Sequence, residues 1–292
     1  MKLRQTIFPY LIVFPLVLIM LGLVFYPATL TLMDSFKSIN LMRPNNVKFV
    51  GFSNYISLLH DPTVLRTAWN SLLYLILAIS GEVIGGLSIA LVLKKKFRGR
   101  GLVLAAVIIP WALPPVTNGV IWKWIYNPTY GVLNDIFLKL HIISTNQVWL
   151  GDARFSLLCV TLVHIWKMIP LTAVILLAAL QTISDELYEA ANIDGANKLQ
   201  SFWHITIPLL KPALAIALTQ ATFAAINLFD EIFVLTGTAL DTRSILVQDY
   251  LIAFRQLDLG LGMSLSLIIT VITLAISLFY VLWLNEKEVK KA

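Results

Sequence analysis

Residues 185–212 read DELYEAANIDGANKLQSFWHITIPLLKP and form a polar segment between two long apolar stretches. Its first part favours a helix, because acids occupy the opening turn and Ser184 can cap it. Gly195 then allows a sharp turn, and the residues after it favour a second short helix. Pro208 and Pro212 are expected to end that helix and to start another. The pattern predicts a small helix–turn–helix at a membrane surface.

The rest of the chain has the composition of a membrane protein. Of its 292 residues, 58% are hydrophobic and 13% are charged, whereas a typical soluble domain has about 25% charged residues. This composition excludes a soluble enzyme, a disordered chain and a disulfide scaffold, and the single cysteine, Cys159, excludes an intramolecular disulfide. A spanning helix needs about 20 mostly apolar residues. Such stretches cover approximately residues 7–32, 71–93, 101–124, 155–180, 212–235 and 261–284.

We therefore predict an all-α polytopic membrane protein in which residues 1–292 form one transmembrane domain with six helices. The first stretch is expected to remain as a helix, because it is too long for a signal-peptide core and lacks a small-residue cleavage site.

The Lys and Arg residues predict the orientation, since they concentrate on cytoplasmic flanks. They lie before the first span, between spans 2 and 3, between spans 4 and 5, and after the last span. These residues are Lys2, Arg4, Lys94, Lys95, Lys96, Arg98, Arg100, Lys198, Lys211, Lys287, Lys290 and Lys291. Six alternating spans place all four groups on one side. Both termini are therefore expected in the cytoplasm, and the protein in the cytoplasmic (inner) membrane.

The segment 185–212 is expected to contact another protein. An ordinary helix resting on the bilayer is the alternative, but anionic headgroups would repel its acids. The runs Glu189-Ala190-Ala191 and Asp194-Gly195-Ala196, followed by Ile205-x-Ile207-Pro208, resemble the EAA loop of binding-protein-dependent ABC importer permeases. The resemblance implies that this loop contains a coupling helix that docks on a cytoplasmic ATPase. The implied contact residues are Glu189, Ala190, Ala191, Asp194, Gly195 and Ala196.

The resemblance extends over most of the chain and narrows the subfamily. It includes Phe49-Val50-Gly51-Phe52-x-Asn54-Tyr55, Trp69-Asn70-Ser71, residues 126–134 (YNPTYGVLN) and Val234-Leu235-Thr236. Together these motifs resemble a carbohydrate-uptake permease of the maltose/glycerol-phosphate type, specifically the larger maltose permease subunit without its large extracytoplasmic insertion. The implied fold is the transmembrane domain of a type I ABC importer.

The sequence contains no GxxxxGK[ST] phosphate-binding loop, so the chain is not expected to be an enzyme. ATP and Mg²⁺ are expected in a partner ATPase, and no cofactor is expected in this chain. The four histidines are scattered without metal-ligand spacing, so no metal site is predicted.

Ionisable residues inside the predicted spans mark either a polar pathway or structural pairs. His164 and Lys167 are three residues apart, so both can face one side of a helix. Lys167 either lines a water-filled pathway together with Asp230 and Glu231, or snorkels to the outer interface and pairs structurally with an acid. Glu82 favours the structural alternative, because nearby glycines indicate close helix packing.

The resemblance also implies where a solute would be contacted. The matched positions on spans 3 and 4 are Trp111, Pro115, His164, Lys167, Met168 and Leu171. The matched positions on span 5 are apolar in this chain, namely Ala221, Ala224, Ala225 and Leu228. Nearby Phe223, Asn227 and Asp230 supply the aromatic and polar groups that sugars require. Trp111 has an alternative interpretation as a packing residue beside a proline-broken helix.

The predicted function is that of the membrane-spanning subunit of an ATP-driven importer for a sugar or sugar-like solute. Transport would proceed by alternating access. The expected partners are a second permease, two cytoplasmic ATPase subunits, an extracytoplasmic solute-binding protein and membrane lipid, without nucleic acid. A heterodimer is favoured over a homodimer. An amino-acid or peptide permease is the alternative within this class, and a stand-alone secondary transporter is the alternative outside it.

Overall fold

The structure is a computed structural model that describes residues 2–284, apart from the side chains of residues 2–9, 11 and 154. The cationic side chains expected to mark the two termini, those of Lys2, Arg4, Lys287, Lys290 and Lys291, lie outside the described residues. The described part is mostly helical, as predicted, and it contains a single two-stranded sheet. The chain divides into two compact units.

The first unit comprises residues 1–64 and 249–270. Its elements are α1 (Lys2–Met20), the π-helical turn η1 (Leu21–Phe25), α2 (Tyr26–Asp34), β1 (Lys37–Ser38), β2 (Lys48–Phe49), α3 (Ser53–His60) and the π-helical turn η3 (Leu251–Arg255). The strands are antiparallel, with Lys37 opposite Phe49. The apolar helix through α1 and α2 is exposed along its described length, as a lipid-facing helix would be.

The motif at residues 49–55 has a structural role in this unit. Gly51 has a φ of +55°, a left-handed conformation that favours glycine. The buried Asn54 amide donates hydrogen bonds to the carbonyls of Ser35, at 2.8 Å, and Lys37, at 3.0 Å. Ser264 also donates to the Ser35 carbonyl, at 2.8 Å. These bonds join the end of α2 to α3 and to α14.

The second unit comprises residues 65–248 and 271–292. Its helices are α5 (Arg100–Ala112), α6 (Pro115–Ile125), α7 (Val132–Lys139), α8 (Ala153–Thr182), α9 (Asp185–Ile193), α10 (Lys198–Ser201), the π-helical turn η2 (Phe202–Thr206), α11 (Ile207–Ile226) and α12 (Asp230–Leu235). Three helices contribute residues to both units: α4 (Pro62–Lys94), α13 (Ile245–Tyr250) and α14 (Leu259–Leu284).

Glycines let α4 approach α8 closely, as the sequence predicts. A Cβ atom added at Gly81 or Gly85 would lie 2.6 or 2.7 Å from the Cδ1 atom of an isoleucine on α8. At Gly86 it would lie 2.7 Å from Thr172 Cγ2 and 3.1 Å from the backbone nitrogen of Ala173. The core beside this contact consists of buried residues of α4, α8 and α11 and includes Ile183. They are Ala90, Leu93, Leu176, Leu177, Leu180, Ile183, Leu210, Ala213 and Ala217.

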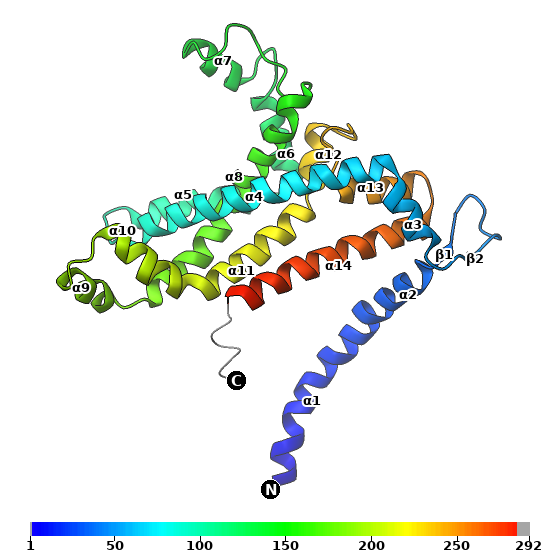
Figure 1. Ribbon diagram of the computed structural model, residues 1–292, viewed down its shortest axis with the longest axis horizontal. Coiled ribbons are helices and arrows are strands. Elements are labelled where there is room, and N and C mark those ends of the chain that lie inside the picture. Colours follow the sequence, from blue (N-terminus) through cyan, green and yellow to red (C-terminus); the bar gives the residue numbers. More distant parts are fainter. Residues whose placement is uncertain (1, 285–292) are drawn as a thin grey trace. The chain divides into compact units, whose positions relative to one another are not determined.

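The two ends of α4 contact different loops. Near its start, Asn70 donates to the carbonyls of Leu240 and Arg243, and Tyr74 donates to that of Thr242 at 2.8 Å. At its end, Lys94 contacts α9. The 20 residues from Tyr74 to Lys94 rise about 30 Å in a helix, which is the thickness of a bilayer's hydrocarbon core. The loop after α12 and the helix α9 therefore lie at opposite ends of α4 (Figure 1).

Five helical segments are long and apolar enough to cross a membrane. They are Ile12–Asp34, Pro62–Lys94, Phe155–Thr182, Lys198–Leu235 and Leu259–Leu284. They correspond to five of the six predicted spans. The predicted span 101–124 differs, because α5 and α6 meet there at 98°. Leu113 and Pro114 separate these helices, and Pro115 begins α6, since proline cannot continue the hydrogen-bond pattern of the preceding helix.

The prediction that Pro208 and Pro212 separate two helices is wrong. The chain is helical without interruption from α10 through η2 and α11. In the wider π-helical turn, the Ile207 N–H donates to the Phe202 carbonyl. This turn accommodates the proline ring of Pro208, which would meet the carbonyl four residues earlier in an ordinary α-helix.

Candidate functional site

The predicted helix–turn–helix is present as α9, a glycine turn and α10. The Ser184 hydroxyl accepts a hydrogen bond from the Glu186 N–H at 3.3 Å, as predicted for the cap of α9. Gly195 has a φ of +84°. The N–H groups of Gly195 and Ala196 donate back to the carbonyls of Asn192 and Ala191, at 3.1 and 2.9 Å. These two bonds form a Schellman turn, which fixes the direction of the chain after α9.

The segment that contains α9 and α10 is attached to the transmembrane helices. Lys94, at the end of α4, lies 3.7 Å from the Asp185 carboxylate and 4.2 Å from the centre of the Tyr188 ring. The Tyr188 hydroxyl lies 2.9 Å from that of Thr206. Tyr188 and Ile205 also pack against the core of α4, α8 and α11. These contacts hold α9 against the ends of the transmembrane helices.

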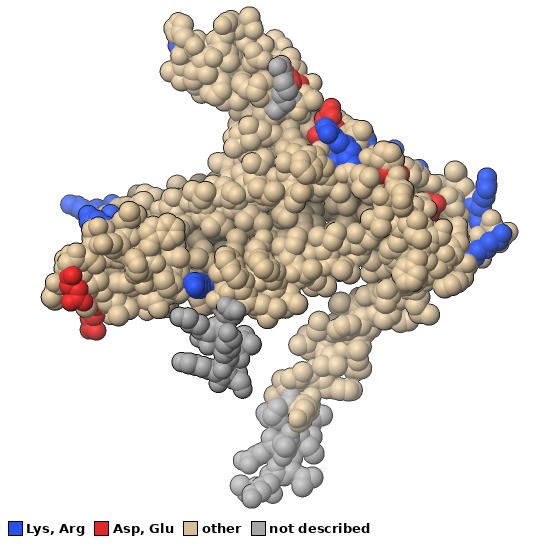
Figure 2. Space-filling model, in the orientation of Figure 1, with Lys and Arg blue, Asp and Glu red and all other residues tan. Residues whose placement is uncertain are grey.

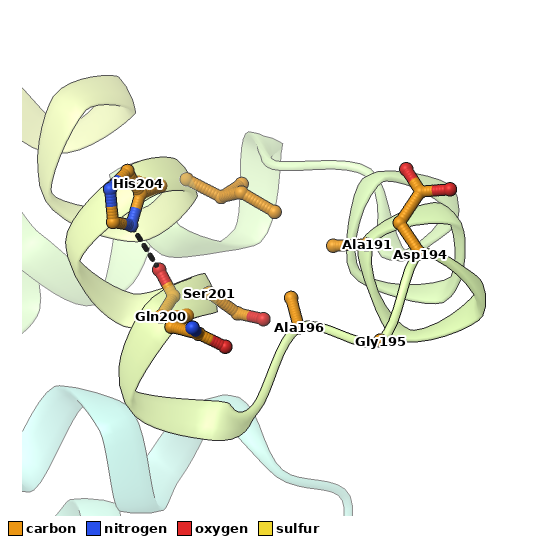
Figure 3. Close-up of a pocket in the computed structure, with 8 residues that line it drawn as sticks. Ala191, Asp194, Gly195, Ala196, Gln200, Ser201 and His204 are labelled. Atoms are coloured by element: carbon orange, nitrogen blue, oxygen red, sulfur yellow. Dashed lines mark hydrogen bonds between the residues drawn. The ribbon is translucent and has the colours of Figure 1, made fainter.

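A cavity of about 320 Å³ lies between the end of α9 and the helix formed by α10 and η2 (Figure 3). Four of the predicted contact residues line it: Ala191, Asp194, Gly195 and Ala196. Polar side chains on the facing wall come from α10 and η2, where His204 Nδ1 lies 3.0 Å from the Gln200 carbonyl oxygen. Glu189 lines a different cavity, and Ala190 is exposed.

The predicted solute residues on spans 3 and 4 lie in different surroundings. Trp111 is 47% exposed and lies just before the bend between α5 and α6. His164 is buried, and its Nε2 lies 3.3 Å from Oε1 of the fully buried Glu82, without the alignment of a hydrogen bond. Lys167 donates to Glu231 Oε1 at 3.3 Å. Met168 and Leu171 are half-buried.

One face of α11 is open and partly polar. Phe223 is 57% exposed, and the Asn227 amide donates to its carbonyl at 2.8 Å. A cavity of about 570 Å³ extends along this face from Pro212 to Phe223. Its lining includes Thr219 and Gln220, whose buried Oγ1 and Oε1 atoms have no hydrogen-bond partner among the described residues.

Sequence reasoning missed Thr219 and Gln220. The signal was available, because Gln220, Phe223 and Asn227 have the i, i+3, i+7 spacing of one helix face. Of the positions matched by resemblance, Ala221 and Ala225 fall on the opposite face of α11 and are buried, as is Leu228 just after the helix. Ala224 and Asp230 are half-buried, and Asp230 begins α12.

The motif at residues 126–134 folds its own loop, chiefly through Asn134. The buried Asn134 amide donates to the carbonyls of Pro128 and Gln147, at 3.3 and 3.0 Å. Its oxygen accepts from the Gln147 N–H and from Trp149 Nε1, at 3.2 and 2.9 Å. Gly131 is required here, because a Cβ atom would lie 2.3 Å from the Asn127 carbonyl oxygen.

The apolar helices, the anchored segment after α8 and the loops at the other end of α4 define a membrane permease domain. The chain belongs to the family of binding-protein-dependent transport system inner membrane components, whose model matches residues 82–291. This membership confirms the resemblance found in the sequence and favours the importer class over a stand-alone secondary transporter.

Individual relatives extend the match to nearly the whole chain. The chain is 30% identical to the sulfoquinovosyl glycerol transport system permease protein SmoG of Agrobacterium fabrum, over 99% of this chain and 94% of that protein. It is 34% identical to the trehalose/maltose transport system permease protein MalF of Thermococcus litoralis, over 96% of this chain and 94% of that protein.

A solved structure has the same fold. A chain of a bacterial ABC transporter that imports the acidic polysaccharide alginate superposes with a TM-score of 0.83. The two chains are 21% identical, and the match covers 98% of this chain and 99% of the other. The fold is therefore that of an ABC importer permease, as predicted.

Proposed function

We propose that this chain is the membrane-spanning subunit of an ATP-driven importer that translocates a sugar or sugar-like solute delivered by an extracytoplasmic binding protein. The observation that carries this proposal is the segment α9–α10. It is exposed and acidic, it is anchored on three transmembrane helices, and it lies at the opposite end of α4 from the loop after α12.

A cytoplasmic ATPase is the proposed partner of this segment. Four large apolar side chains are exposed there: Leu187 (47%), Ile193 (87%), Leu199 (67%) and Trp203 (58%). They lie in the same segment as the acids of α9, and such a mixed apolar and acidic surface suits a protein partner better than an anionic bilayer. ATP and Mg²⁺ belong to that partner, which docks on Glu189, Ala190, Ala191, Asp194, Gly195 and Ala196.

The orientation follows from this assignment. The end of α4 that carries Lys94, Lys95 and Lys96 faces the cytoplasm together with α9, in agreement with the distribution of cationic residues. With α5 and α6 counted as one broken span, the chain crosses the membrane six times, and both termini lie in the cytoplasm. The membrane is the cytoplasmic (inner) membrane. A second, similar permease completes the solute pathway, preferably as a heterodimer.

A sugar is the proposed solute class, because relatives along the whole chain are named for sulfoquinovosyl glycerol and for trehalose/maltose. The face of α11 offers suitable groups, with an aromatic ring at Phe223 and unpaired oxygens at Thr219 and Gln220. Trp111 and Pro115 contribute at the bend between α5 and α6. His164 and Lys167 are paired with Glu82 and Glu231 in this structure. They contact the solute when the helices switch between the inward-facing and outward-facing states.

Reconstitution of the whole complex tests the function. Proteoliposomes that contain this chain, its partner permease and the ATPase should hydrolyse ATP faster when the binding protein and its sugar are added. A screen over sugars, polyols and modified sugars identifies the solute. No stimulation by any of them, with stimulation by amino acids or peptides, would contradict the sugar assignment.

Co-purification tests the coupling segment directly. Glu189→Arg and Gly195→Arg should each abolish recovery of the ATPase with the permease, because both place a bulky cation at the proposed contact. Asp135→Arg on α7 is the matched control, since its side chain is 59% exposed and lies away from α9. Equal recovery of the ATPase with all three variants would refute the assignment.

A further inference from the structure

A second cavity, of about 1120 Å³, lies beside the coupling segment where α4 ends. Four lysines line it: Lys94, Lys95, Lys96 and Lys198. The first three end α4 and follow it, whereas Lys198 begins α10. Figure 2 shows cationic side chains gathered near α10 and the start of α5, and acidic ones over α9. The proposed importer function does not explain why this cavity is cationic.

The lysines outnumber the acids that face them. Lys94 is already engaged, with Asp185 and with the Tyr188 ring. Lys95, Lys96 and Lys198 are exposed and form no ion pair with any acid in the part of the chain that the structure describes. The lining acids are Asp185 and Glu189. With Asp185 balanced by Lys94, three ammonium groups remain against one carboxylate, so the cavity attracts an anion.

The cavity also has an apolar side. Leu91 lies on the last turns of the apolar helix α4, and Phe202 lies in η2, on the helix that continues into the membrane as α11. Asn197 and Ser201 add polar groups beside the lysines. The apolar span of α4 ends at Lys94, so the lysines are at the depth of the lipid headgroups. An occupant with an anionic head and an apolar tail fits both sides.

We propose that this cavity binds the phosphate of an anionic phospholipid, held by Lys95, Lys96 and Lys198. The bound phosphate connects the end of α4 to the start of α10 across the base of the coupling segment. Anionic lipid therefore stiffens the segment that takes up work from the ATPase. Lipid binding itself does not depend on the proposed function, whereas the effect on ATP hydrolysis rests on it.

The test uses the purified complex of this permease with its partner permease and ATPase, in nanodiscs. The discs contain phosphatidylcholine alone or a mixture with phosphatidylglycerol, and native mass spectrometry measures the retained phosphatidylglycerol. The variant Lys95→Gln/Lys96→Gln/Lys198→Gln should retain it on the order of a hundredfold more weakly, since each surface lysine contributes about fivefold. Solute-stimulated ATP hydrolysis should lose its dependence on phosphatidylglycerol in the same variant.

Two controls separate charge from folding. The exposed residues Arg43, Lys48 and Lys139 do not line the cavity, so changing all three to Gln removes equal charge and should leave retention unchanged. Changing the three cavity lysines to Arg keeps the charge and should preserve retention. Equal retention by the glutamine variant and the wild type would overturn the proposal.

A third experiment distinguishes a bound lipid phosphate from a soluble anion. Inorganic phosphate is added to discs of phosphatidylcholine alone. If it stimulates ATP hydrolysis as phosphatidylglycerol does, the ligand is soluble phosphate and the lipid assignment is overturned. If phosphatidylglycerol is retained through the three lysines but the ATPase does not bind this chain, the lipid site stands and the proposed function fails.

Discussion

Glu82 and Lys167, two charged side chains within the apolar helices, each lie beside a charged or titratable partner. Glu82 on α4 lies 3.3 Å from His164 on α8, and Lys167 on α8 lies 3.3 Å from Glu231 on α12. Both members of the second pair are nearly buried, with side-chain exposures of 11% and 6%. Removal of one partner would leave the other charge buried and unpaired, which is more costly than removal of both.

Lys167→Met is therefore expected to destabilise the protein by about 3–5 kcal/mol, because the Glu231 carboxylate loses its partner. Lys167→Met/Glu231→Leu should recover most of this loss. Denaturant unfolding of the purified protein in detergent measures both values. If the single and double variants are equally unstable, the ion pair does not account for the effect. A stable double variant that no longer transports would place Lys167 in the solute pathway.

Asp249 lies on α13, outside the apolar spans, and should make the stability of the protein depend on pH. Burial raises its pKa from 3.8 to about 6, although the Ser266 hydroxyl, 2.5 Å from Oδ2, opposes this shift. The folded state thus prefers the protonated acid. The stabilisation is complete below pH 3.8 and is lost as the pH rises to about 6.

Over that interval Asp249 should reduce the free energy of unfolding by up to about 1.4 kcal/mol per pH unit. Thermal unfolding in detergent at a series of pH values measures the slope. Asp249→Asn should remove this contribution, whereas Asp241→Asn, at an exposed position, should not. An unchanged slope in Asp249→Asn would show that another group is responsible.

At the scale of helices, small residues set the distance between α4 and α8. Gly86 differs from the other two positions, because its neighbours include the backbone of α8 as well as a side chain. A side chain there would have to separate the two helices, whereas a flexible isoleucine can move away from Gly81 or Gly85.

Gly86→Val is expected to destabilise the protein by about 1–3 kcal/mol through overpacking. Gly101→Val is the control, because nothing lies within 4 Å of a Cβ atom at that position, which is also helical. The yield of monodisperse protein and the midpoint of thermal unfolding in detergent compare the two variants. Equal loss in both would attribute the effect to valine in a helix rather than to the contact with α8.

The helices that could be predicted from the sequence are those set by apolar length and by caps. Ser184 and Gly195 act through local geometry, so they were identified correctly. The sequence could not show that proline breaks the helix between α5 and α6 but leaves it continuous at Pro208. A proline can end one helix and fit a π-helical turn in another. The sequence pattern places Gln220 on one face of the helix. It could not show that Gln220 Oε1 is buried without a hydrogen-bond partner among the described residues, because that depends on tertiary contacts.

At the scale of the whole chain, α4 separates two sets of loops by about the thickness of a bilayer. Its Lys94 end contacts α9, and its other end contacts the loop after α12. The loop that contains Asn134 lies at the same end as the loop after α12. Lys123 donates to the Val234 carbonyl at 2.9 Å, and residues of both loops line one cavity.

Thiol labelling in intact cells tests this arrangement. A membrane-impermeant maleimide should label Asn146→Cys in intact cells and Ile193→Cys only after permeabilisation, because the two exposed positions lie on opposite sides. The native Cys159 is buried, so it should give little background. Labelling of position 193 in intact cells would contradict the proposed orientation.

The uninterrupted helix from α10 to the end of α11 has a mechanical consequence. Its 29 residues, Lys198 to Ile226, form a rod of roughly 40 Å that begins directly after the proposed ATPase contact and carries Gln220 and Phe223 near its other end. Each residue added to or deleted from η2 would rotate everything beyond it by about 100°. The register of this one turn therefore sets which side chains of α11 face the proposed solute pathway, although no residue of the turn is itself proposed to contact the solute.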